Sequence, residues 1–202
     1  MKKFIALALS LCMVCAMSVS AFAAEVDSDG GAGTTPVYLS STEDGSIDGE
    51  PAATAMSVTV PTALPMAMSQ TGDVTTATDC KIINNSFGAV RVKSVTISTA
   101  NGWRLTAFGD KSTLASEKVD SNKLGFVIAI GGGNAVMTDT SNESTQALIS
   151  APIAGCYMSG AGNQNGNTVS VIYNAIVTPL SSPVTNANIA NVVFVIEWDT
   201  AA

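Results

Sequence analysis

The feature of this sequence that most constrains its fold is a period of two in its apolar residues. Side chains of a β-strand point alternately to opposite faces, so this period is typical of a strand with one face on a core and one in water. The pattern is clearest at 89–98, 168–178 and 190–198. A change of phase at Lys93 and Ser94 interrupts the first of these runs and predicts a β-bulge there.

Shorter runs with turn residues between them add further strands to this set. Asn101 and Gly102 are typical of a hairpin turn, which would join the strand at 89–98 to an alternating run at 103–108. Polar residues at 109–123 predict a loop with one helical turn. Further strands are expected at 57–60, 64–68, 80–84, 124–130, 135–137 and 147–153. The sum predicts an all-β fold, an antiparallel β-sandwich or jelly roll of roughly eight to ten strands.

The first residues have the order of a secretory signal peptide. Lys2 and Lys3 precede an apolar stretch at 4–19, and Ala21 and Ala23 supply the small residues of a cleavage site. A retained membrane anchor is the alternative, but polar and acidic residues follow and no basic cluster does. We therefore expect residues 1–23 to be removed after Ala23 and the protein to be extracellular, with no membrane span after cleavage.

Charge divides the rest of the chain into two parts. Residues 24–53 contain acidic residues and no basic one, with many Gly, Ser and Thr, and predict an acidic disordered linker. Residues 54–202 are nearly neutral and predict one sandwich domain. Because Lys and Arg form no cluster anywhere, we expect no nucleic-acid partner.

The chain contains no histidine, the commonest general base and metal ligand. This absence excludes Ser-His and Cys-His catalysis, and we expect no metal and no cofactor. Most carboxylates of the domain fall in predicted turns; Glu197 is the exception, because it alternates with Ile196 and Trp198 and so points away from the core. We predict no catalytic residue and a protein that is not an enzyme.

Two pairs of residues remain as structural or binding candidates. Cys80 and Cys156 could form a disulfide outside the cell, or each could be a buried thiol, and their spacing does not decide between the two. Tyr157 lies in a predicted loop and is the best candidate for an exposed ring that stacks on a sugar. Trp103 is a second candidate, although its strand position favours the core.

Several segments resemble those of exported β-domain surface proteins of clostridia-type bacteria, namely 57–65, 81–86, 90–97, 102–105 and 190–199. The chain is also distantly similar to WxL cell-wall-binding domains, whose first motif matches Trp103-Arg104-Leu105; the second motif is missing, since Asp199 and Thr200 follow Trp198. This resemblance implies a cell-surface role in a Gram-positive bacterium and assigns no functional residue.

From these observations we expect a secreted, non-enzymatic surface protein with a structural or adhesive role. Its partner would be a cell-wall polymer, a surface protein or itself, because the strands at 64–68 and 190–198 contain few charges that would prevent edge pairing. No sortase-type tail follows residue 198, so attachment to the wall is expected to be non-covalent. The alternative is a carbohydrate-binding module that uses loop aromatics such as Tyr157.

Overall fold

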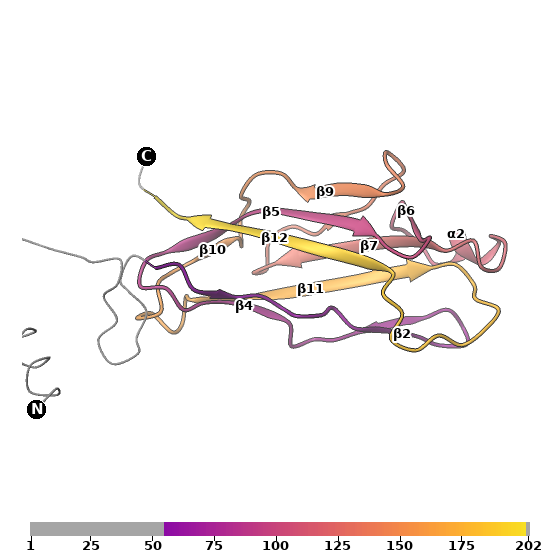
Figure 1. The fold of residues 1–202 in the computed structure, drawn as a ribbon, viewed down its shortest axis with the longest axis horizontal. Helices are drawn as coiled ribbons and strands as arrows, with labels where there is room; N and C mark the ends of the chain where they lie inside the picture. The colour runs from indigo at the N-terminus through magenta and orange to yellow at the C-terminus, as the bar shows by residue number, and fades with distance from the viewer. Residues whose placement is uncertain (1–54, 201–202) are drawn as a thin grey trace, which may run out of the picture. The chain divides into compact units, whose positions relative to one another are not determined.

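A computed structural model describes residues 55–200, so the predictions for 1–23 and 24–53 lie outside the described residues. Strands dominate this part of the chain and the one helix is a single turn (Figure 1). The elements are β1 (Val58–Thr59), β2 (Met66–Met68), β3 (Val74–Thr76), β4 (Lys81–Asn84), β5 (Val90–Thr99), β6 (Arg104–Thr106), α2 (Ser112–Ala115), β7 (Lys123–Ile130), β8 (Val136–Met137), β9 (Thr145–Ile149), β10 (Tyr157–Met158), β11 (Thr168–Val177) and β12 (Ala190–Trp198).

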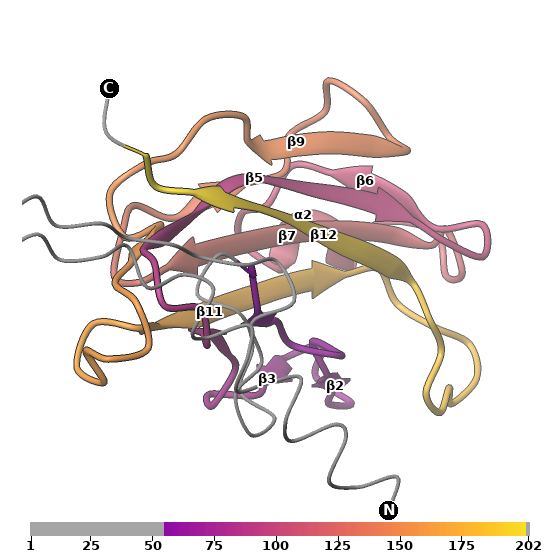
Figure 2. The ribbon, with the colours of Figure 1, turned by 60° about the vertical axis from the view of Figure 1, so that its left-hand side comes forward.

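The strands form two main sheets and one small hairpin. The larger sheet has the order β1-β4-β11-β7-β6, with β8 also paired to β7. The smaller sheet has the order β10-β5-β12, with β9 also paired to β5. Strands β2 and β3 pair with each other (Figure 2). Every pairing is antiparallel except that of β6 with β7. The protein is therefore an all-β sandwich, as predicted, with twelve strands instead of eight to ten.

The core lies between the two main sheets and is built from the residues that the period of two assigns to one face. In β5 and β7 the inward side chains of Val92, Ile97 and Ile128 are fully buried. Strands β7 and β11 pair from Val171 opposite Ile130 to Val177 opposite Leu124, which aligns their inward residues in register. This long pairing forms the centre of the larger sheet.

The predicted bulge in β5 is confirmed. Val195 of β12 pairs with Ser94, and the next residue, Ile196, pairs with Val92, so Lys93 is the extra residue. The bulge restores the alternation, because Val92 and Val95 then face the core although three positions separate them.

The hairpin predicted at Asn101 and Gly102 is wrong in its pairing. Asn101 and Gly102 do form a tight turn, with φ of 51° and 80°. The strands on either side, however, belong to different sheets, because β6 pairs with β7 and not with β5. Leu105 of β6 is buried against the core, so the turn carries the chain from one sheet to the other. The turn at Asn101 and Gly102 is thus confirmed, whereas burial of Leu105 in the core determines that β6 pairs with β7.

No helix among residues 55–200 combines the length and the apolar character that crossing a bilayer requires.

Candidate functional site

Strand β12 forms an open edge of the smaller sheet. It pairs with β5 along its whole length, and within residues 55–200 no other strand pairs with it. The outer edge of β12 therefore presents backbone N–H and C=O groups that lack a ladder partner in this part of the chain. The strand has no charged residue before Glu197, so little opposes pairing with another strand.

The inward face of β12 is less well covered than that of its neighbour. Val192, Phe194 and Ile196 pack on the core and are only half-buried. On the outward face, Val193 is 53% exposed and Val195 is 42% exposed. Strand β12 therefore leaves apolar surface accessible on both faces, which is typical of an interaction site.

An apolar groove of about 490 Å³ lies beside the first residues of β12. Ala190 and Val192 form one wall, and residues 62–68, which include β2, form another. None of the described residues that line it carries a charge. The weakly charged segments 64–68 and 190–198, predicted from the sequence to favour association, thus meet at one groove.

Trp103 also lines this groove, half-buried against the core. The residue thus contacts both the core and the groove, and its use as a sugar-stacking ring stays a prediction. Within Trp103-Arg104-Leu105, Trp103 packs against the core and Leu105 is buried.

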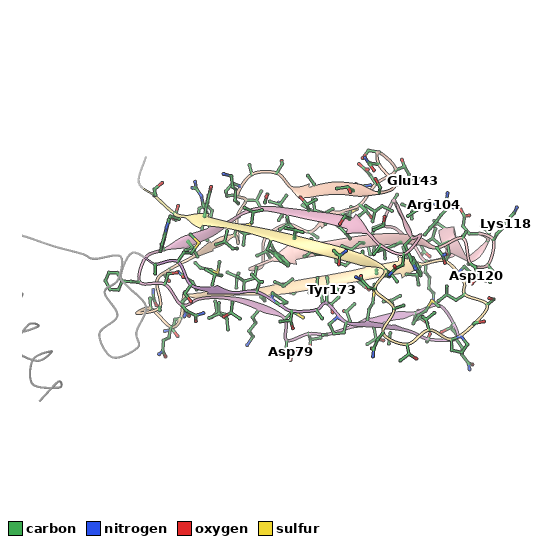
Figure 3. The ribbon with its side chains drawn as sticks, in the orientation of Figure 1. Asp79, Arg104, Lys118, Asp120, Glu143 and Tyr173 are labelled. Carbon is green, nitrogen blue, oxygen red and sulfur yellow. The ribbon has the colours of Figure 1, made fainter. Side chains whose placement is uncertain are left out.

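Tyr173 of β11 fixes the wall formed by residues 62–68. Its hydroxyl donates a hydrogen bond to the carbonyl oxygen of Pro65 and accepts one from the N–H of Ala77 at 3.3 Å. The hydroxyl of Thr76 donates to the Tyr173 carbonyl oxygen at 3.0 Å. Burial raises the pKa of Tyr173, so the hydroxyl stays protonated and able to donate. Through these bonds Tyr173, which Figure 3 labels on β11, holds the β2–β3 hairpin in place.

Glu197 lies on the outer face of the smaller sheet within a group of charges. Its carboxylate accepts from Arg91 Nε at 2.8 Å and lies 3.0 Å from Lys93 Nζ. Hydrogen bonds from Lys93 and Arg91 lower the pKa of Glu197. Asp199 also pairs with Arg91, at 3.3 Å. A carboxylate held ionised in this way is unsuited to donate a proton as a general acid.

Tyr157 lies beside this charged group. It belongs to the short strand β10, not to a loop as predicted, and pairs with Arg91 across the sheet. Tyr157 is 48% exposed, which agrees with the exposure expected from the sequence. Tyr157, Arg91 and Glu197 form a row across the outer face, because Arg91 is the register partner of the other two.

The remaining carboxylates are dispersed. Figure 3 shows Asp79, Asp120 and Glu143 at separate places on the sandwich. Asp120 illustrates their role: its oxygens accept hydrogen bonds from the N–H and hydroxyl of Ser181, and these bonds lower the pKa of Asp120. Among residues 55–200 no three His, Cys, Asp or Glu side chains lie close enough to hold a metal ion.

The two cysteines are free thiols in the structure, Cys80 half-buried and Cys156 fully buried. Their backbones belong to opposite sides of the sandwich: the carbonyl oxygen of Cys80 accepts from Val171 of the larger sheet, and that of Cys156 accepts from Val92 of the smaller sheet. Of the two alternatives that the sequence left open, the structure has the separate thiols.

No protein-family model, no curated protein and no solved structure matches this chain.

Proposed function

We propose that this protein is a secreted structural protein of the bacterial cell surface, and that it self-associates through the open edge of its sandwich. The observation that carries the proposal is β12, a nine-residue strand with a free edge, exposed Val193 and Val195, and no charge from Ala190 to Ile196. Proteins that stay monomeric usually protect such an edge with charges, prolines, bulges or a covering loop.

Pairing at this edge is favourable for two physical reasons. Each new ladder hydrogen bond satisfies backbone groups at the edge. The half-buried side chains of β12, Val192 and Phe194 among them, also lose water contact when the groove beside them is filled, at about 25 cal/mol per Å² of apolar surface. Association through β12 therefore completes a core that the described part of the chain leaves partly open.

The surface location rests on the sequence. The signal-peptide pattern of residues 1–23 supports export, and the similarity to exported surface proteins that includes Trp103-Arg104-Leu105 supports a place at the envelope. In this proposal the attachment to the wall is non-covalent.

Sedimentation velocity of residues 24–202 over a wide concentration range tests self-association. We expect oligomers that grow with concentration, and we expect Val195→Lys, which places a charge beside the open edge, to reduce them strongly. Ile172→Lys is the matched control, because Ile172 is equally apolar and 59% exposed but lies on β11, which has neighbours on both sides. A wild-type protein that remains monomeric throughout would exclude the proposal.

Retention on purified Gram-positive cell walls, measured beside an insoluble polysaccharide, tests the surface role. We expect wall-specific retention, and the Val195→Lys variant, measured in parallel, shows whether that retention requires self-association. Equal retention on both materials would contradict wall specificity.

A carbohydrate-binding module is the second candidate, and the row of Tyr157, Arg91 and Glu197 is the observation that favours it. An exposed ring beside charged hydrogen-bonding groups on a flat sheet is suited to stack on a sugar. In that case Tyr157→Ala would abolish retention on polysaccharide and leave self-association intact.

A further inference from the structure

We infer that the groove beside β12 binds an extended segment from a second copy of this chain, and that this segment is the uncharged run at 30–42. The inference rests on the proposed self-association and specifies the two surfaces that meet. It assigns residues 24–53 a part in assembly, beyond that of a linker.

The shape of the groove favours a single extended strand as its occupant. Residues 62–68 form a wall opposite Ala190 and Val192, so the space beside β12 is bounded on both sides. Tyr173 anchors that wall through Pro65 and Ala77. The groove volume of about 490 Å³ is within the range of pockets that enclose a ligand, about 300–1,000 Å³. An added strand could pair with β12 through its backbone while its alternate side chains fill the groove.

The chemistry of the groove selects the segment. Because the described residues that line it are uncharged, a charged side chain would lose its hydration there without a partner. Between residues 24 and 54, acidic residues occur up to Asp29 and again from Glu43, and the run at 30–42 between them has none. This run contains Val37 and Leu39, which would point to the same face of a strand and could enter the groove together.

The length of the preceding chain allows this contact between two molecules. Residues 43–57 separate the run from β1 and can span up to about 50 Å when extended. The run can therefore reach a neighbouring molecule while β1 of its own molecule stays paired with β4. Every copy then offers one groove and one run, and such a head-to-tail contact builds open chains of molecules.

A complementation experiment with residues 24–202 tests the inference. One variant has a defective run, Val37→Asp with Leu39→Asp, and an intact groove. The other has a defective groove and an intact run; it is made as Met68→Asp and, separately, as Val192→Asp. Met68 is exposed at the groove, so Met68→Asp keeps the test decisive where Val192→Asp does not fold.

We expect each variant alone to sediment as a monomer and an equimolar mixture to form a one-to-one complex, because only one intact groove and one intact run then meet. Two controls should assemble as the wild type does: Ile47→Asp, which lies outside the run, and Ile172→Asp, which lies on the outer face of β11. Thermal melting establishes that each variant is folded.

Three results would overturn the inference. Normal assembly of the run variant would show that another segment or surface is the occupant, while the proposed self-association would stand. A mixture that remains monomeric would show that the run does not bind the groove of a second molecule. Binding of the run to the groove of its own molecule would give this result. A wild-type chain that never assembles would remove the proposed function together with the inference.

Discussion

Strands β5 and β12 make an instructive pair, because they lie side by side and have the same alternation of apolar residues. In β5 the inward residues Val92, Val95 and Ile97 are completely buried, since β9, β10 and β12 flank the strand. In β12 the inward residues Val192, Phe194 and Ile196 stay half-buried although one of them is aromatic. The two patterns are alike and the two environments are not.

The difference teaches that periodicity identifies the face of a strand that meets the core, and that the number of neighbours decides how much of that face is buried. Within the described residues β12 has a neighbour on one side only. A further strand beside β12 would remove more of its apolar surface from water and so stabilise the assembly. The inward face of β5 is already buried, so it has no such surface to contribute.

The largest expected effect tests this contrast directly. Ile97→Ala in β5 should lower the free energy of unfolding by about 3 kcal/mol, because it leaves a cavity in a closed part of the core. Ile196→Ala in β12 should cost about 1 kcal/mol, because its side chain is half-exposed already. Urea unfolding at a concentration where the wild type is monomeric measures both values, and equal losses would show that β12 is fully covered in solution.

A second prediction concerns Asn84, whose hydrogen bonds hold together the segments at one end of the sandwich. The side chain of Asn84 is fully buried, donates to the carbonyl oxygens of Gly88 and Ser159, and accepts from the N–H of Ser86. Asn84→Ala leaves these groups without partners and should cost about 2 kcal/mol by urea unfolding. The neighbouring variant Asn85→Ala, which loses one exposed bond to Thr59, should cost less than about 0.5 kcal/mol. A comparable cost for the two would refute this role of Asn84.

The third prediction uses pH on the outer face of β12. Since Lys93 and Arg91 lower the pKa of Glu197 in the folded protein, its ionised form stabilises the fold above the unfolded value of about 4.3. That contribution is lost as the pH falls through the lower folded pKa. We expect the midpoint of urea unfolding to decrease from pH 6 to pH 3, and Glu197→Gln to reduce this slope.

The matched variant for the pH experiment is Glu143→Gln. Glu143 is more exposed, and its carboxylate lies 3.8 Å from the Arg104 guanidinium. We expect Glu143→Gln to leave the slope nearly unchanged. If Glu197→Gln also leaves it unchanged, the charged group on this face does not stabilise the fold.

The smallest expected effect on stability is that of Val193→Thr. Threonine suits a strand as well as valine does, and Val193 is 53% exposed, so the free energy of unfolding should change by less than about 0.5 kcal/mol. Self-association should weaken several-fold, because the substitution places a hydroxyl on the apolar edge. Sedimentation and urea unfolding of the same preparation separate the two effects; a large loss of stability would mean that Val193 is buried within a single molecule.

The sequence predicts individual segments of the candidate site, but not that these segments come together. The segments 64–68 and 190–198 were recognised as weakly charged strands, and the exposure of Tyr157 was expected. The groove could not be predicted, because residues 62–66, Trp103 and residues 186–192 meet there from distant parts of the sequence. Glu197 was correctly placed on the outer face, whereas its partners Arg91 and Lys93 come from the pairing of β12 with β5.

The sequence by itself determined the all-β class, the buried face of each long strand and the bulge at Lys93, because all three depend on the order of apolar and polar residues along one strand. Tertiary structure alone decided that β6 joins β7, that Cys80 and Cys156 belong to opposite sheets, and that β12 lies at an edge. Each of these depends on which distant strand lies next to a given strand in the sheet. Backbone hydrogen bonds have the same chemistry in every strand, so they do not specify that partner.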